Sequence, residues 1–340
     1  MITKLRVENY KCLRDVSVEL RPFTVLIGKN DTGKSSLLEA LWVLGKVARG
    51  VRPKTNSEIE KLVSMGAQPA EVRWSVEVSS AAAASLGEPL RAAYSSRDAS
   101  ASDGIKLLSH ELTTSDLYRL EPERLAEPGA FDLHADQEPR LAADGRGLPL
   151  VLDHVLGTDR AAFDAIEREL QKAVPYVKSI RLKSARVSLP NGGTTPGKAL
   201  FFELHPGGFE IPATSASQGV LLFLAYLTLA HLPAAPSILL IEEPENGIHP
   251  RQLQRVAEHL KRLTAGEHAT QIVTATHSPY FLDFVPPEDV LVFGRKDSGE
   301  TVVRPLLSLA GVRERLDSGF SLGEMWFNVG EDRLLAEALS

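Results

Sequence analysis

Hydrophobic residues along this chain fall into two recurring patterns, continuous apolar runs and repeats at helical spacing. The runs predict strands buried on both faces, as in a parallel sheet. They occupy 23–27, 237–241 and 272–273. Apolar side chains at helical spacing lie between and after them, at 35–46, 220–230 and 253–263. Strands that alternate with helices in this way predict an α/β fold, a mixed sheet flanked by helices.

A third pattern, alternation of apolar and polar residues, predicts half-buried strands elsewhere. Residues 71–78 alternate and predict an N-terminal antiparallel β portion beside the parallel sheet. A first hairpin is predicted from strands at 177–189 and 198–204, which a glycine turn joins. A second hairpin is predicted from strands at 201–203 and 209–211, around Pro206-Gly207-Gly208. An amphipathic helix is predicted over 159–173.

Two stretches lack clear periodicity. Residues 80–102 are rich in Ala and Ser and predict irregular structure, and 103–150 predict loops around short apolar runs. We therefore expect a domain split in sequence by an inserted region. The expected segments are 1–79, an insertion or lid at 80–176, a second half at 177–306 and a helical tail at 307–340.

The loop between the first strand and the first helix fits the phosphate-binding pattern G-x-x-x-x-G-K-[ST]. Strand, glycine loop and helix is the context that this pattern requires. Glycines let backbone N–H groups approach phosphate oxygens, and the helix N-terminus adds partial positive charge. A lysine here reaches the β- and γ-phosphates, and the next hydroxyl can ligate Mg²⁺. The residues are Gly28, Lys29, Asn30, Asp31, Thr32, Gly33, Lys34 and Ser35.

Two adjacent carboxylates, Glu242 and Glu243, end the apolar run at 237–241. Acids at the carboxyl end of a parallel strand lie at the edge where such sheets bind ligands. One can hold Mg²⁺, and the other can orient or deprotonate an attacking water. His277 follows the next run at the same edge, and Ser217 and Gly219 open an apolar helix whose N-terminus favours anions.

Composition is that of an ordinary globular enzyme. The chain has 340 residues, a net charge of −6 and one cysteine, Cys12, which excludes an intramolecular disulfide and a cysteine-based zinc site. The acidic balance argues against DNA binding by bulk charge. A local basic patch remains an alternative, although solvated strand faces look the same: Lys178, Arg181, Lys183 and Arg186. No leader begins the chain, and His231, Pro233 and Pro236 interrupt its most apolar region. We therefore expect a cytoplasmic protein without a membrane span.

The order of these motifs resembles that of ABC-type P-loop ATPases. The opening Thr3–Lys11 and the segment Gly33–Leu41 are similar to those of SMC/RecF-like ATPases. Glu242-Glu243-Pro244-Glu245-Asn246-Gly247-Ile248-His249-Pro250 and Thr276-His277-Ser278-Pro279 resemble the ATPase domains of OLD-family nucleases and related stand-alone ATPases of phage-defence operons. Ser321–Trp326 resembles the end of the stand-alone proteins. The resemblance covers 1–47 and about 199–330.

This resemblance implies roles for individual residues. Gly28 through Ser36 would bind the triphosphate of ATP. Glu242, where most ABC proteins have Asp, would hold Mg²⁺ with Ser35, Glu243 would be the general base, and His277 would sense the γ-phosphate. Ser217 and Gly219 would contact a γ-phosphate held by another protomer, and Glu245–Gly247 would cross that interface. No basic residue follows Gly219, which would weaken its phosphate contact. Gln68 is a candidate for the glutamine near the metal.

Three functional classes follow. The first is an ATP-hydrolysing switch, a homodimer or higher homo-oligomer that closes on ATP and controls a separate effector, as in anti-phage systems. The second is a RecF-like repair ATPase that binds DNA directly. The third is a nucleotide-binding regulator with negligible turnover, which Glu243 and His277 disfavour. Because only 63 residues follow His277, we expect the output chemistry to lie in the partner. The insertion is equally a docking surface or a cover for the nucleotide.

Overall fold

The computed structural model describes residues 1–51, 63, 71–79, 90–96, 112, 114–131, 138–188, 192–232, 236–265 and 269–328. The chain forms two compact units, each made of segments that are distant in sequence. The first unit comprises Met1–Leu117, Pro236–Pro244 and Leu263–Ser340, and the second comprises Tyr118–Ala235 and Glu245–Arg262.

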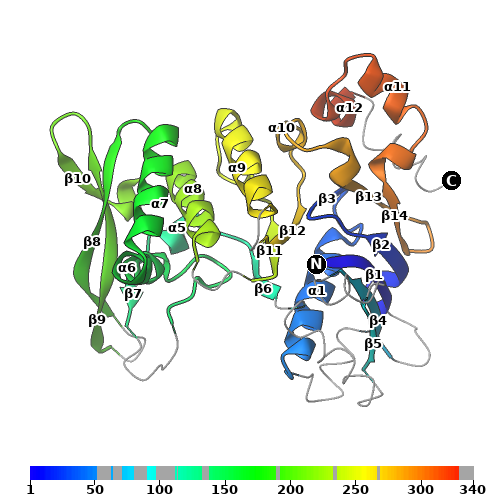
Figure 1. Cartoon of the computed structure of the whole chain (residues 1–340), viewed down its shortest axis with the longest axis horizontal. Coiled ribbons are helices and arrows are strands. Elements are labelled where there is room, and N and C mark those ends of the chain that lie inside the picture. Colours follow the sequence, from blue (N-terminus) through cyan, green and yellow to red (C-terminus); the bar gives the residue numbers. More distant parts are fainter. Residues whose placement is uncertain are drawn as a thin grey trace. The chain divides into compact units, whose positions relative to one another are not determined.

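A six-stranded sheet forms the centre of the first unit, in the order β14-β13-β3-β12-β11-β6 (Figure 1). β3 pairs in parallel with both β12 and β13, and β12 pairs in parallel with β11. β14 turns back and pairs antiparallel with β13, so the sheet is mixed. The strands are β3 (Phe23–Gly28), β6 (Thr114–Tyr118), β11 (Ile238–Glu242), β12 (Gln271–Ala275), β13 (Val290–Arg295) and β14 (Thr301–Pro305).

Burial explains why these strands read as continuous apolar runs. Every residue of β3 and of β12 is buried, because both faces of the sheet are covered. Helix α1 (Lys34–Ala48) packs on β3, β11 and β12 and also contacts β1. Leu37, Leu38 and Leu41 of α1 are fully buried in the core of this unit. The hydrophobic spacing of this segment predicted that buried face correctly.

A second, antiparallel sheet in the first unit has the order β2-β1-β4-β5. Its strands are β1 (Ile2–Tyr10), β2 (Leu13–Glu19), β4 (Arg73–Val78) and β5 (Leu90–Ser95). Trp74 lies between Tyr10 and Tyr94, with ring centroids 5.9 Å and 5.4 Å away. The sheet confirms the predicted N-terminal antiparallel portion. β5, however, lies in 80–102, so the expectation of irregular structure was wrong for Leu90–Ser95, and most of the rest of that stretch lies outside the described residues. β5 contains two adjacent alanines and no β-branched residue, so its sequence gives a weak strand signal, and pairing with β4 supplies the order.

Short helices complete the first unit after β12, some before the β13–β14 hairpin and some after it. They are α10 (Pro279–Leu282), α11 (Val312–Asp317) and α12 (Leu322–Asn328), with 3₁₀ turns at Pro287–Asp289 and Leu306–Ser308. α12 packs against α10. Gly323 permits this contact, since a Cβ there would lie 2.3 Å from the carbonyl oxygen of Pro279.

The second unit is built around a long antiparallel hairpin covered by helices (Figure 1). β9 pairs with β8, with β10 and with the short β7. Helix α7 packs on β8, α6 packs on β9, and α7 and α8 pack against each other. The elements are α5 (Pro122–Leu125), β7 (Gly129–Ala130), α6 (Leu148–Thr158), α7 (Arg160–Ala173), β8 (Val177–Ser188), β9 (Thr194–Leu204), β10 (Phe209–Pro212), the 3₁₀ turn Ala213–Ser215, α8 (Gln218–Ala230) and α9 (Pro250–Leu263).

Both hairpins and the helix at 159–173 were predicted correctly. The expectation of loops over 103–150 was wrong in part, because β6, α5 and the start of α6 lie there. Pro149 in the first turn of α6 obscured that helix, although proline is well tolerated there.

The compact units cut across the expected segments 80–176 and 177–306. Helices α8 and α9 belong to the second unit because α8 packs on α5 and α7, and Arg255 of α9 donates to the Lys172 carbonyl oxygen at 2.8 Å. The functional division into ATPase halves and an insertion stays a prediction. In the part of the chain that the structure describes, none of the helices combines the length and apolar character needed to cross a bilayer.

Candidate nucleotide-binding site

The loop from Gly28 to Gly33 connects the central strand β3 to helix α1. Gly28 has φ +146°, and a Cβ at this position would lie 2.3 Å from the carbonyl oxygen of Phe293. Gly33 has φ +105°, and its Cβ would lie 2.6 Å from Thr301 Oγ1. Both conformation and close approach therefore require glycine at the two positions that the motif specifies.

Lys34 is buried inside this loop, with 5% of its surface exposed. Its ammonium donates to the carbonyl oxygens of Gly28 at 2.6 Å and Lys29 at 2.7 Å. Thr32 Oγ1 donates to the Lys29 carbonyl oxygen at 2.8 Å and closes the loop from the other side. The loop thus holds a positive charge at its centre, where a phosphate chain would need it.

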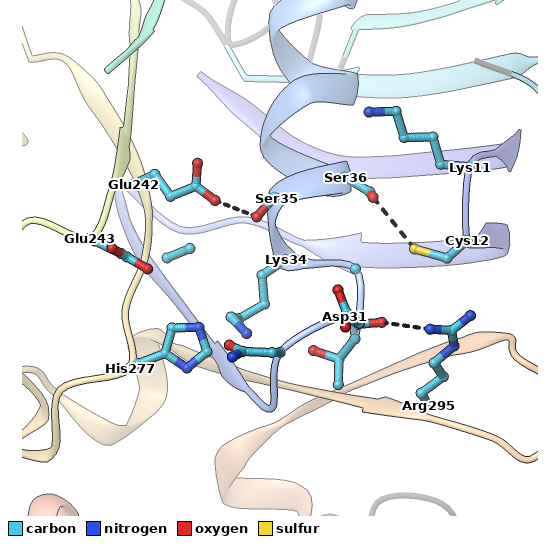
Figure 2. A pocket seen from close by; sticks show the side chains of 14 residues that line it. Lys11, Cys12, Asp31, Lys34, Ser35, Ser36, Glu242, Glu243, His277 and Arg295 are labelled. Carbon is cyan, nitrogen blue, oxygen red and sulfur yellow. Dashed lines mark hydrogen bonds between the residues drawn. The ribbon is translucent and has the colours of Figure 1, made fainter. Parts of the chain in front are cut away.

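Glu242 is the last residue of β11 and faces the first turn of α1. The Ser35 hydroxyl donates a hydrogen bond to Glu242 Oε1 (Figure 2). A hydroxyl and a carboxylate in contact are an oxygen pair of the kind that binds Mg²⁺, whose other ligands are usually waters and substrate phosphates. The two predicted metal ligands therefore lie together.

Glu243 leaves the sheet with an unusual backbone conformation. Its φ is +51°, in the left-handed region that non-glycine residues rarely adopt. Its N–H still donates to the Ala275 carbonyl oxygen at 2.8 Å, so β12 holds the turn in place. The side chain is exposed and lines the same pocket as Lys34 and Glu242. Strain at an exposed carboxylate is typical of residues that are placed for chemistry.

His277 follows β12 and points toward Lys34 and Glu243 (Figure 2). Backbone bonds hold its neighbour, because Thr276 N–H donates to the Leu26 carbonyl oxygen at 3.0 Å. Partial burial and the Lys34 charge lower the pKa of His277, while Glu243 and Glu242 oppose that shift. The imidazole is therefore neutral near pH 7 in the nucleotide-free protein and can accept or donate a hydrogen bond.

These side chains line one pocket of about 540 Å³, a volume within the range of small-molecule sites. The pocket brings together predicted residues from the ends of β11 and β12, the glycine loop and the first turn of α1. It also contains residues to which the sequence assigned no role: Lys11, Cys12 and Arg295. Lys11 and Cys12 lie in the N-terminal segment that resembles SMC/RecF-like ATPases. Arg295 is the last residue of β13, and the sequence carried no signal for a role there.

The pocket fits a nucleoside triphosphate with Mg²⁺. The glycine loop leaves space that a Cβ would fill, Lys34 supplies charge, and Ser35 with Glu242 supplies hard oxygen ligands. Gln68, the candidate for a further metal contact, lies outside the described residues.

Comparison with known families agrees with this geometry. The profile of a family described as "AAA domain, putative AbiEii toxin, Type IV TA system" matches residues 23–283, which is more than half of the chain. The chain belongs to this AAA-domain family. The matched range includes the glycine loop, Glu242, Glu243 and His277.

The relatives refine the placement of this AAA-domain protein. The OLD nuclease of Thermus scotoductus is 23% identical over 346 residues, which cover 89% of this chain and 63% of that nuclease. An Smc head bound to the C-winged helix domain of ScpA superposes with a TM-score of 0.58 and 17% identity, over 89% of this chain and 96% of that one.

A second Smc head, bound to the C-terminal domain of ScpA derived from Pyrococcus furiosus, gives a TM-score of 0.56 at 14% identity. The match covers 93% of this chain and 98% of that one. The chain thus has the fold of an SMC-like, ABC-type ATPase domain, and its sequence is related to that of an OLD nuclease.

Ser217 and Gly219 lie in the second unit of this AAA-domain protein, at the start of α8. Ser217 is the N-cap residue, and its exposed side chain makes no capping hydrogen bond. A Cβ on Gly219 would lie 3.2 Å from Gln252 Oε1 and 3.5 Å from the Gly247 carbonyl oxygen. The helix start and the loop Glu245–Gly247, predicted to share an interface, are therefore neighbours within this unit.

The predicted basic patch on β8 is largely neutralised. Lys178 and Arg181 both bind Glu203, at 2.5 Å each, and Lys183 pairs with Glu210. Hydrogen bonds from Lys178, Arg181 and Ser179 lower the pKa of Glu203 to about 2, so it stays charged throughout the physiological range. Three of the four patch residues are therefore engaged by acids of the neighbouring strands.

Proposed function

We propose that this chain binds ATP with Mg²⁺ and hydrolyses it slowly. The observation that carries the proposal is the grouping of Glu243, His277 and the Ser35–Glu242 pair around Lys34 in one pocket. A protein that only bound nucleotide would need the loop and Lys34. It would have no use for a second, strained carboxylate beside the metal ligands.

The residues would divide the reaction among them. Lys34 and the loop amides bind the phosphates, and Ser35 and Glu242 hold Mg²⁺, which neutralises charge on the phosphate oxygens. Glu243 orients a water and accepts its proton as the water oxygen bonds to the γ-phosphorus and the bond to ADP breaks. Neutral His277 donates a hydrogen bond to the γ-phosphate and fixes its orientation.

We further propose that two chains associate head to tail, each supplying Ser217 and Gly219 to the nucleotide of the other. The exposed hydroxyl of Ser217 and its freedom from capping support this role. Turnover is slow in this scheme because a site is complete only in the closed pair. A dimer held through another surface is compatible with it, since only closure must depend on ATP.

Closure would regulate a separate effector in defence against phage. The relation to an OLD nuclease, of which the chain spans 63%, supports a link between ATP and a nucleic-acid-cleaving activity. The description of its family as a toxin of a type IV system supports action together with other proteins. Direct binding to DNA is the weaker proposal, because three of the four basic residues of the patch on β8 are paired with acids.

A Ser217→Arg variant tests the scheme. If no other surface already pairs the chains, wild-type ATPase activity per chain should rise with protein concentration, and ATP should increase the mass measured by light scattering. Ser217→Arg should bind ATP as the wild type does by calorimetry but show neither effect. Full, concentration-independent hydrolysis by Ser217→Arg would contradict the shared site.

A further inference from the structure

The hairpin β13–β14 lies against the phosphate loop, a contact that the phosphate-binding motif does not predict. β13 pairs with β3 up to the Phe293–Gly28 pair, where the loop begins. The carbonyl oxygen of Phe293 occupies the space that a side chain at residue 28 would need. The hairpin therefore continues past the end of β3 and can contact the loop itself.

Thr301, the first residue of β14, makes the principal contact. It is buried, with 6% of its surface exposed, and its hydroxyl donates to the Thr32 carbonyl oxygen at 2.8 Å. Its backbone N–H donates to the Cys12 carbonyl oxygen at 3.3 Å. One residue thus joins the hairpin, the phosphate loop and the N-terminal sheet. The absence of a side chain on Gly33 lets the hydroxyl approach this closely.

Arg295 makes a second contact from the other strand of the hairpin. Its Nη1 donates to the Asp31 carbonyl oxygen at 3.3 Å (Figure 2). Its Nε donates to the Gly299 carbonyl oxygen at 3.1 Å. Two successive carbonyl groups of the loop, those of Asp31 and Thr32, are therefore bound by the hairpin. Arg295 is exposed, so its contact contributes less than the buried one from Thr301.

These bonds determine where the loop N–H groups point. In a trans peptide the C=O and N–H groups project in opposite directions. Because the Thr32 carbonyl group binds the hairpin, the Gly33 N–H of the same peptide points away from the hairpin. Because the Asp31 carbonyl group binds Arg295, the Thr32 N–H also points away from the hairpin. Successive N–H groups with a common direction form the anion-binding concavity of a phosphate loop.

We propose that Thr301 is a positioning residue that fixes the phosphate loop in its binding conformation before nucleotide arrives, assisted by Arg295. The proposal rests on the proposed nucleotide function, which it deepens. It assigns affinity for the phosphate chain partly to a residue more than 260 positions from the motif.

Thr301→Val tests this, because valine keeps the shape and removes the hydroxyl, while Thr301→Ser keeps the hydroxyl. Thr274→Val is the matched control, since the Thr274 hydroxyl is also buried in this unit but has no hydrogen-bond partner among the residues that the structure describes. Nuclear magnetic resonance measures the amide resonances of Gly33 and Lys34 in the nucleotide-free protein. Calorimetry measures the affinity for pyrophosphate with Mg²⁺.

Thr301→Val should shift both amide resonances and weaken pyrophosphate binding about fivefold, the effect of one neutral hydrogen bond. Thr301→Ser should restore both, and Thr274→Val should leave both unchanged. Resonances and affinity in Thr301→Val that match those of Thr274→Val would overturn the proposal. Shifted resonances in a protein whose wild type binds no pyrophosphate would support the positioning role while defeating the nucleotide function.

If Thr301→Val does not fold, Arg295→Gln at its exposed position carries the same test. It should shift the Thr32 amide resonance and weaken pyrophosphate binding about twofold, as expected for a weaker, exposed bond. An unchanged Thr32 resonance would then overturn the proposal.

Discussion

The Ser35 hydroxyl donates a hydrogen bond to the Glu242 carboxylate, across 207 positions of sequence. The bond connects the first turn of α1 to the end of β11, two elements that a parallel sheet brings to the same edge. It brings the proposed hydroxyl and carboxylate ligands of Mg²⁺ into contact within one chain. In the proposed function, the first unit therefore assembles these ligands without a second protomer.

Replacing Lys34 with alanine should abolish detectable ATP binding. The ammonium is the buried positive charge at the centre of the loop, and two loop carbonyl groups lose their donor with it. Isothermal titration calorimetry measures the loss. Lys296→Ala, which removes an exposed lysine of the same unit, is the control and should bind as the wild type does. Retention of wild-type affinity in Lys34→Ala would show that the loop is not the nucleotide site.

Glu243→Gln should bind ATP and hydrolyse it about 10²- to 10⁴-fold more slowly, because the amide keeps the shape but cannot accept the proton. Phosphate release at saturating ATP measures this. Glu242→Gln provides the contrast, since it should raise the Mg²⁺ concentration needed for half-maximal activity. Undiminished phosphate release by Glu243→Gln would show that another residue is the general base.

Gly28→Ala should destabilise the protein by more than about 2 kcal/mol, because a positive φ is combined with a backbone clash. Its Cβ would lie 2.3 Å from the Phe293 carbonyl oxygen. Gly50→Ala separates the two causes, since Gly50 has φ +82° and no atom within 4 Å of its Cβ position. Chemical denaturation should give the smaller loss for Gly50→Ala. Equal losses would mean that the contact with β13 does not matter.

The second unit should lose stability as the pH falls from about 6.5 toward 4. Burial lowers the pKa of His259 to about 4, against the opposing charge of Glu169 and with support from Arg262 and His231. Nδ1 of His259 lies 3.3 Å from Glu169 Oε2, yet neither ring nitrogen makes a well-aligned hydrogen bond among the described residues. A depressed histidine pKa means that the unfolded chain binds the extra proton. The stabilising contribution of neutral His259 is thus complete above pH 6.5. Below pH 6.5 the free energy of unfolding falls by at most about 1.4 kcal/mol per pH unit.

Denaturant midpoints of a His259→Leu variant measure this dependence. They should change less between pH 7 and pH 5 than those of the wild type. The exposed His249→Gln variant should follow the wild type. Parallel pH dependence in all three proteins would assign the acid sensitivity to other groups.

The sequence predicted the parts of this site that depend on short motifs and buried strands. Gly28, Gly33 and Lys34 are constrained by local backbone geometry, so their spacing was sufficient. Glu242 and Glu243 follow a strand whose burial on both faces is visible as an apolar run. The contacts of Thr301 and Arg295 could not be predicted, because they depend on β13 pairing beside β3 and on a carbonyl group that any residue could supply. β5 was not predicted for a related reason, since its regular structure depends on pairing with β4.

The central position of β3 has a consequence for the order in which the protein is made. All six residues of β3 are buried, and both of its neighbours come from the last third of the chain: β12 begins at Gln271 and β13 at Val290. A ribosome that adds about 5–20 residues per second needs roughly 10–50 seconds to travel from Gly28 to Gln271. During that interval the nascent strand has neither partner, and its apolar surface is open to chaperones or to another chain. The nucleotide site is consequently among the last parts of the molecule to form, and prematurely terminated chains lack it although they contain the whole glycine loop.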